Sequence, residues 1–211
     1  MHCDSAREIV FQQLHLNKRC SQNVSVIQHG SYVEHYENKI SRFESREKLK
    51  LRQNDIVFLF FGIIRPYKGI QKLIKVIKKL SEDNRVKLVI AGKPINEDIL
   101  YEIKKEIGSK KCIQCHLRYV SDCEIQTFMN AADAVVLPYN EFLTSGVALL
   151  AMSFGKALIV PKKGCNIDLD PEGIPLIIRD KRPNLRDSFI RKVKPAFVGR
   201  KIDQPLGAHL V

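Results

Sequence analysis

Between residues 56 and 160 the sequence alternates between short apolar runs and longer segments with a helical spacing of apolar residues. The runs have the length of strands and carry few polar residues, which is typical of strands buried on both faces of a parallel sheet. They occupy residues 56–61, 86–91, 112–117, 134–137 and 157–160, with a shorter sixth run at 176–178. Parallel strands need crossover connections, which the intervening helices would supply. The alternation therefore predicts an α/β domain in which a parallel sheet has helices on both faces.

The intervening helices are indicated by periodicity and by a capping signal. In residues 70–80 apolar side chains recur every three or four positions with lysines between them, as in an amphipathic helix. Ser121 and Glu124 match a capping box, which predicts a helix that starts there and ends near Ala131. Further helices are expected at 97–107 and 146–154.

The chain divides into three segments by pattern and composition. The regular alternation predicts a domain over 54–178, preceded by a mixed segment, 1–53, and followed by a basic tail, 179–211. Inside the first segment the sequence predicts a helix at 6–16, a short strand at 24–27 and a helical connection at 41–51. Fifty-three residues are too few for a second domain of several βαβ units.

The net charge of +12, from 35 Lys+Arg against 23 Asp+Glu, favours a partner that carries phosphates: a nucleotide, a nucleic acid or an anionic lipid surface. About half of that excess lies in residues 179–211, so the tail is either a solvated basic segment or a contact for an anionic membrane. No nucleic acid is expected as partner, because the basic residues are not interleaved with aromatic ones and no nucleic-acid motif is present.

Several features together indicate a cytosolic protein. No stretch approaches eighteen apolar residues, and the first residues lack the apolar core of a secretory signal. The six cysteines are expected to be reduced thiols, because a chain of 211 residues with 45% hydrophobic residues needs no disulfide framework. Cys112 and Cys115 form a CxxC pair, but positions three apart on a strand face opposite ways, so no shared metal is expected.

Ligands of open parallel sheets bind beyond the carboxyl ends of the strands, which singles out four loops. These loops are residues 62–69, 92–96, 119–122 and 139–146. In the first loop Gly62 permits a close approach of the backbone to a ligand, while Arg65 and Lys68 bring cations suited to phosphate. The loop matches neither of the glycine-rich phosphate-binding patterns, so an ordinary turn with solvated cations remains the alternative.

The fourth loop leads into a helix with good capping residues. Thr144 and Ser145 suit the N-cap position, and Gly146 and Val147 would begin the helix. The free amides and the positive end of the helix dipole would then face the ligand edge of the sheet, a ready anion site. The simpler reading is that Ser145 only caps the helix. Two loops suited to phosphate at one end of one sheet favour a ligand that carries a diphosphate.

Five segments of the predicted domain form an ordered set of motifs: FGIIRPYKG at 61–69, LVIAGK at 88–93, YVSD at 119–122, ADAVVLPY at 132–139 and LTSGVALLAMSFGK at 143–156. In this order they strongly resemble the nucleotide-binding half of group 1 (family 4) glycosyltransferases. VIQHG at 26–30 is similar to the family's passage out of its N-terminal domain, so the resemblance covers roughly residues 24–173. It implies the GT-B fold, in which the C-terminal of two Rossmann-like domains holds a nucleotide sugar and the N-terminal one holds the acceptor. It also implies transfer with retention of anomeric configuration and no bound metal.

Carried over by position, the resemblance assigns roles to individual residues. Lys68 matches the family's diphosphate-binding lysine, and the helix start at 145–147 matches the amides that bind the diphosphate. The usual arginine after the first glycine is Ile63 here, with Arg65 as its candidate substitute. The family's two glutamates fall at positions 142 and 150, which are Phe and Leu in this chain. The candidate donor-binding residues are Gly62, Arg65, Lys68, Tyr119, Glu141, Thr144, Ser145, Gly146 and Val147.

The resemblance also implies partners. Residues 1–53 would be a linker and remnant of the N-terminal acceptor domain, and 179–211 departs from the family. We expect the donor-binding half of a glycosyltransferase, which uses a nucleoside diphosphate sugar as substrate, requires no cofactor and acts on a glycan or polyprenol-linked acceptor. It would need an acceptor-domain subunit or a homodimer, and would lie in the cytoplasm with peripheral contact at the inner face of the membrane. The alternative is a non-catalytic nucleotide-sugar-binding remnant. No catalytic residue is assigned.

Overall fold

The computed structural model describes residues 4–15, 24–27, 29–80, 84–140, 144–161 and 177–178. Six parallel strands form its sheet in the order β3-β2-β1-β4-β5-β6. The strands are β1 (Ile56–Phe61), β2 (Val86–Ala91), β3 (Ile113–His116), β4 (Ala134–Val136), β5 (Ala157–Pro161) and β6 (Ile177–Ile178). Each lies within one residue, at either end, of a run predicted from the sequence. The predicted parallel sheet is therefore confirmed.

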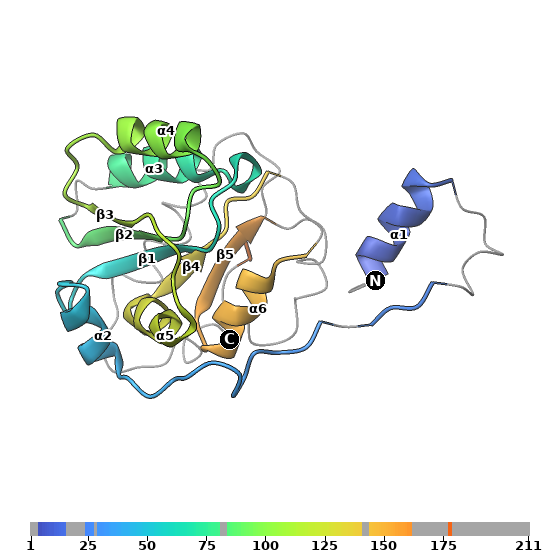
Figure 1. Cartoon of the computed structure of the whole chain (residues 1–211), viewed down its shortest axis with the longest axis horizontal. Coiled ribbons are helices and arrows are strands. Elements are labelled where there is room, and N and C mark those ends of the chain that lie inside the picture. Colours follow the sequence, from blue (N-terminus) through green and yellow to red (C-terminus); the bar gives the residue numbers. More distant parts are fainter. Residues whose placement is uncertain are drawn as a thin grey trace.

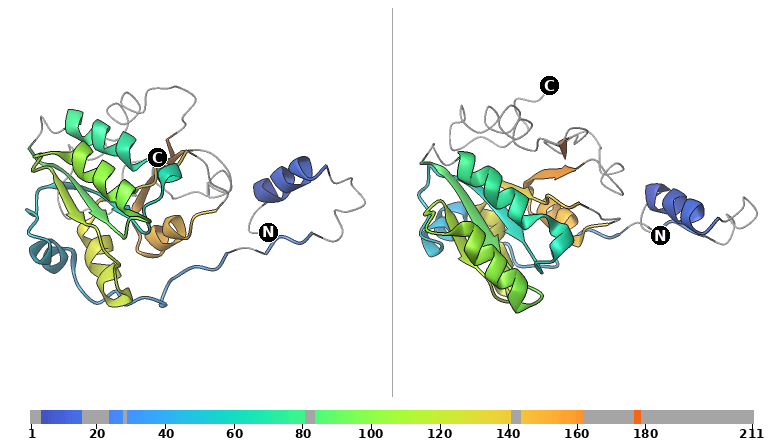
Figure 2. Two further views of the ribbon diagram at one scale, coloured as in Figure 1. Left: turned by 45° about the horizontal axis from the view of Figure 1, so that its top comes forward. Right: turned by 90° about the horizontal axis from the view of Figure 1, so that it is seen from above.

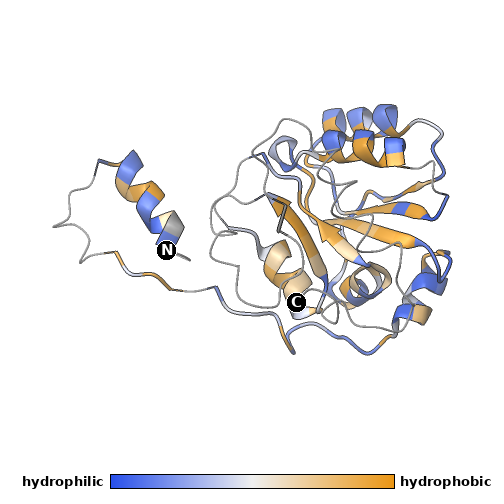
Figure 3. Cartoon of the chain, turned by 180° about the vertical axis from the view of Figure 1, so that it is seen from behind, coloured by the Kyte–Doolittle hydropathy of each residue, from blue (hydrophilic) through white to orange (hydrophobic). Residues whose placement is uncertain are grey.

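Helices cover both faces of this sheet (Figures 1 and 2). Helices α3 (Ile70–Leu80) and α4 (Glu97–Ile107) lie on one face, whereas α5 (Asp122–Ala131) and α6 (Gly146–Ser153) lie on the other. Helix α2 (Arg42–Lys48) packs beside α5, and α1 (Asp4–Gln13) lies away from the sheet in all three views. The ribbons of α3 and α4 are coloured hydrophobic on the side toward the sheet and hydrophilic on the outside (Figure 3). This layering matches the predicted Rossmann-like fold class.

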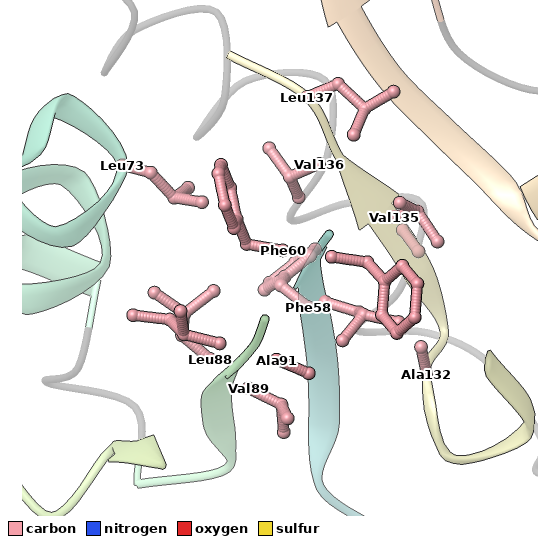
Figure 4. Close-up of a cluster of buried hydrophobic side chains, with 14 of the residues drawn as sticks. Phe58, Phe60, Leu73, Leu88, Val89, Ala91, Ala132, Val135, Val136 and Leu137 are labelled. Atoms are coloured by element: carbon pink, nitrogen blue, oxygen red, sulfur yellow. The ribbon is translucent and has the colours of Figure 1, made fainter. Parts of the chain in front are cut away.

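The core lies on both sides of β1, all six residues of which are buried. Because successive strand residues face opposite ways, Phe60 points toward Leu73 of α3 and Leu88 of β2 (Figure 4). Phe61 points to the other face, where its ring lies 6.3 Å from that of Phe128 in α5. Burial on both faces explains why this strand reads as a continuous apolar run.

One predicted strand is wrong. Residues 24–27 have no regular structure, and Ile27 is 71% exposed. A strand requires a neighbour for its backbone hydrogen bonds, and none of the pairings of the described sheet involves these residues. The apolar pattern of residues 24–27 does not reveal whether such a neighbour is present.

A buried ion pair connects α2 to the start of β1. Arg46 is fully buried, and its Nη2 donates to Asp133 Oδ2 at 2.8 Å. Its Nε donates to the carbonyl of Ala131, and its Nη1 donates to further backbone carbonyls. Asp133 Oδ2 also accepts from the amide of Val57 in β1, and its other oxygen accepts from Arg42. Asp133 therefore lies at the centre of this network. Its role as the acceptor at the centre of this network depends on a partner 87 residues away.

Several predictions lie outside the described residues or remain without a test. The tail 179–211 and Glu141 fall outside the described ranges. Among the described cysteines, Cys112, Cys115 and Cys123 are free thiols. No helix in the described ranges is long and apolar enough to cross a membrane.

Candidate functional site

The strand order creates a topological switch point between β1 and β4. The chain moves from β1 outward to β2 and β3, and then crosses back to β4 on the other side of β1. The connections that leave β1 and β4 therefore depart to opposite faces of the sheet and open a crevice at the carboxyl ends of these strands, where such sheets bind their ligands. Of the four loops that the sequence singled out, those at 62–69 and 139–146 follow these two strands.

The two loops contact each other directly. The amide of Asn140 donates to the carbonyl of Tyr67 at 2.8 Å, and Lys72 Nζ donates to the side chain of Asn140 at 2.7 Å. The rings of Tyr67 and Tyr139 meet edge to face at 5.9 Å. Gly69 has a φ of +66°, and a Cβ at this position would overlap the carbonyl of Pro138. A larger residue at Gly69 would therefore separate the two loops.

Lys68 is a buried cation without a counter-ion. The residue is 8% exposed, and its ammonium lies 5.4 Å from the centre of the Tyr139 ring. The ammonium forms no hydrogen bond or ion pair with any part of the chain that the structure describes. Burial lowers the pKa of Lys68 to about 8, and the positive charge of Arg65 adds to this effect. Burial of an uncompensated charge is costly, so the site favours an anion that supplies the missing charge.

Arg65 lies at the start of the 3₁₀ turn η2 (Pro66–Lys68), whose C-terminal residue is Lys68. Its side chain is exposed and makes no ion pair within the described ranges. The chain thus places two cations close enough to repel one another. This arrangement disfavours the alternative of an ordinary turn with solvated cations, at least for Lys68.

The amino end of α6 lies beside the Lys68 ammonium. A Cβ built on Gly62 would be 3.3 Å from Cγ2 of Val147 and 3.7 Å from Nζ of Lys68. Ser145 caps the helix as predicted, because its hydroxyl accepts from the amide of Ala148 at 3.3 Å. The amides of Gly146 and Val147 donate to no acceptor in the described structure. Free amides, a helix dipole and a buried ammonium therefore converge at Gly62.

Not every candidate joins this cluster. Thr144 is exposed next to Ser145, and Glu141 lies outside the described residues. Tyr119 is 70% exposed in the loop after β3. Its described electrostatic contact is with Tyr36, whose pKa is raised by burial and then by the charges of Asp122, Tyr32 and Tyr119. The structure therefore brings together Gly62, Arg65, Lys68, Ser145, Gly146 and Val147.

Sequence reasoning missed Tyr32. Its hydroxyl is 3.2 Å from the position that a Cβ of Gly146 would take, at the amino end of α6. The contact depends on the packing of the segment before the sheet domain against α6, which lies more than a hundred residues further along the chain. No local pattern around Tyr32 predicts that packing.

The chemistry of the cluster suits a diphosphate. Two cations and two free amides offer several donors to a group with several negative oxygens. Within the described residues, no group of three or more His, Cys, Asp or Glu side chains could hold a metal ion.

Comparison with known proteins agrees with the fold. The family model described as Glycosyl transferases group 1 matches residues 41–169. The chain is 32% identical over 192 residues to the lipopolysaccharide 1,2-N-acetylglucosaminetransferase of Salmonella typhimurium, which covers 86% of this chain and 49% of that protein. It is 30% identical over 138 residues to the GDP-mannose:glycolipid 4-beta-D-mannosyltransferase of Xanthomonas campestris pv. campestris, which covers 65% of this chain and 38% of that protein. The chain thus spans half or less of the length of these relatives.

A solved structure shares the fold of this chain. The C-terminal domain of a glycosyl transferase group 1 family protein from Francisella tularensis superposes with a TM-score of 0.63 and 22% identity. The match covers 82% of this chain and 93% of that domain, so the two share a fold over nearly the whole of the solved domain. Since the family model matches more than half of its residues, the chain belongs to the family of group 1 glycosyl transferases.

Proposed function

We propose that this chain is the donor-binding half of a glycosyltransferase, which holds the diphosphate of a nucleoside diphosphate sugar and transfers the sugar to a glycan or lipid-linked acceptor. The observation that carries the proposal is the buried, unpaired ammonium of Lys68 beside the free amides of α6, at the switch point of the sheet. In this assignment residues 54–178 form the donor domain.

The same groups would assist the chemical step. As the bond between the anomeric carbon and the diphosphate breaks, negative charge builds up on the leaving diphosphate. Fixed cations and amides interact more strongly with that developing charge than with the intact donor, and so lower the barrier. Lys68 and the amides of Gly146 and Val147 are the groups that we assign to this role, with Arg65 as a further cation at the rim.

The acceptor and the stereochemistry belong to the proposal as well. The two curated relatives are named for a glycolipid and a lipopolysaccharide acceptor, which supports a lipid-linked glycan as the acceptor class. Retention of anomeric configuration is proposed from the family resemblance alone. The relative from Xanthomonas campestris is named for a beta linkage. NMR analysis of the product, compared with the anomer of the donor, would show whether the configuration is retained.

A second candidate is a donor-binding module that does not catalyse transfer by itself. The described residues contain one sheet domain, and the chain spans half or less of the length of its relatives. In this candidate, transfer needs an acceptor domain in addition to these residues. Transfer requires the acceptor hydroxyl within about 3–3.5 Å of the anomeric carbon. Radiolabelled donor with a lipid extract, tested with and without a co-expressed acceptor domain, separates the two candidates. Transfer by the single chain would refute the second.

Calorimetric titration with GDP and UDP tests the donor site. Removal of the ammonium in Lys68→Ala should weaken binding by about 1.5–3 kcal/mol, or roughly ten- to a hundredfold. Lys79→Ala is the matched control, because Lys79 lies exposed on α3 and should leave the affinity unchanged. If neither nucleotide binds at millimolar concentration, or if both variants bind alike, the site is not a donor site.

A further inference from the structure

The segment 29–41, which precedes the sheet domain, packs across α6 and α5 (Figures 1 and 2). At one end the amide of Tyr32 donates to the hydroxyl of Ser153 in α6 at 2.9 Å, and that hydroxyl donates to the carbonyl of Leu149 at 2.8 Å. Further along, the amides of Lys39 and Ile40 donate to the side chain of Gln126 in α5. The backbone of the segment is therefore anchored to both helices.

This anchoring directs the side chain of Tyr32 toward the amino end of α6. Its backbone is attached at Ser153, the last residue of the helix, and its hydroxyl lies 3.2 Å from the Cβ position of Gly146, the first. The ring packs against the hydrophobic core and against the ring of Tyr36 at 5.6 Å. The hydroxyl makes no hydrogen bond within the described chain. A phenol hydroxyl in that position is a free donor.

The hydroxyl of Tyr32 lies at a helix start that could bind an anion. The start of α6 carries the free amides of Gly146 and Val147, and Val147 and the ammonium of Lys68 both border Gly62. A helix terminus alone would not identify a ligand site. The ammonium of Lys68 belongs to a residue that is more than nine-tenths buried, and it has no hydrogen bond or ion pair within the described residues. It therefore independently indicates an anion beside Gly62 and Val147.

We propose that Tyr32 is a donor-site residue whose hydroxyl donates a hydrogen bond to a phosphate oxygen of the ligand held by Lys68 and α6. The inference rests on the proposed function and extends it, because the segment before the nucleotide-binding domain then completes the site. Ser153 is a positioning residue, since it acts on the ligand only by fixing the backbone of Tyr32 against α6.

The test compares two tyrosines of one segment. Tyr32→Phe removes the hydroxyl and keeps the ring packing, so it should bind GDP and UDP about tenfold more weakly than the natural protein. Tyr36→Phe is the control, because the Tyr36 hydroxyl lies near Asp122 at the start of α5 and should not affect binding. The thermal unfolding midpoint without nucleotide should be the same for Tyr32→Phe and the natural protein, which excludes a folding defect.

The possible results separate the two proposals. If the natural protein binds neither nucleotide, both the donor site and the role of Tyr32 are refuted. If it binds and Tyr32→Phe binds equally well, the role of Tyr32 alone is refuted. Inorganic pyrophosphate should show the same tenfold loss. A loss with the nucleotides but not with pyrophosphate would overturn the phosphate contact.

Ser153→Ala provides a second, independent test through a double-mutant cycle. On its own it should weaken GDP binding, because the backbone of Tyr32 loses its anchor. In the Tyr32→Phe background it should add nothing, since the hydroxyl that the anchor positions is already gone. Additive losses would show that Ser153 does not act through Tyr32 and would overturn its assigned role.

Discussion

Nucleotide affinity should fall as the pH rises through about 8, because Lys68 must be protonated to hold a diphosphate. Burial, together with the nearby charge of Arg65, lowers the pKa of Lys68 from 10.5 to about 8 in the free protein. A bound diphosphate would raise that pKa back toward its ordinary value, since an opposite charge stabilises the ammonium. Ligand therefore binds the protonated form better, so affinity is fully present below pH 8 and is lost above it.

The size of the effect follows from the fraction of protonated lysine. With a pKa of about 8, roughly a tenth of the free protein carries a protonated Lys68 at pH 9. The dissociation constant for GDP should therefore be about tenfold higher at pH 9 than at pH 7, or about 1.4 kcal/mol. For the same reason, binding at pH 9 should take up about 0.9 proton per nucleotide.

Isothermal titration calorimetry from about pH 7.5 to 9.5, in buffers with different ionisation enthalpies, measures both quantities. Lys68→Arg is the control, because a guanidinium stays charged throughout this range and should remove the pH dependence. Lys156 also has a pKa that burial lowers to about 8, but its Nζ lies against the carbonyl of Asn130 in α5. A dissociation constant that does not change with pH, or an equal slope in Lys68→Arg, would refute the role of the Lys68 proton.

Three further predictions concern stability, loop packing and the tail. Asp133→Asn should lower the free energy of unfolding by about 3 kcal/mol or more in urea titrations, because it leaves the Arg46 charge buried and unpaired. Asp4→Asn, in an exposed ion pair, should change the free energy of unfolding by less than about 0.5 kcal/mol. Equal effects of the two variants would contradict the importance of the network. Gly69→Ala should lower both the melting temperature and the GDP affinity, while Gly108→Ala, at a similar φ but with open space around it, should leave the affinity intact. Deletion of residues 179–211 should weaken sedimentation with anionic liposomes at low salt, and equal binding to neutral and anionic vesicles would rule out the proposed membrane contact.

The sequence predicted the sheet domain well because its signals are local. A continuous apolar run such as that of β1, the amphipathic spacing of α3 and the capping box before α5 each depend on neighbouring residues. The carboxyl-end rule then selected two loops that contact each other in the structure, because the order of strands and helices along the chain largely determines which ends meet. Lys68 and the helix start at Ser145 could be found in this way.

The rest depends on contacts between distant segments. Nothing near Asp133 indicates that Arg46 lies against it, and nothing near Tyr32 indicates that its hydroxyl reaches Gly146. The mistaken strand at 24–27 has the same origin, because an apolar pattern cannot reveal whether a neighbouring strand is available. The burial of Lys68 also could not be predicted from the sequence, because the residues of η2 have the pattern of an ordinary polar turn. The contact of Lys68 with the ring of Tyr139 depends on the fold.

The most direct test of the donor site is a crystal structure of this protein with bound GDP or UDP. We expect the diphosphate to lie between the ammonium of Lys68 and the amides of Gly146 and Val147, with oxygens within about 3 Å of these nitrogens. A nucleotide bound elsewhere, or a diphosphate that leaves Lys68 without a partner, would contradict it.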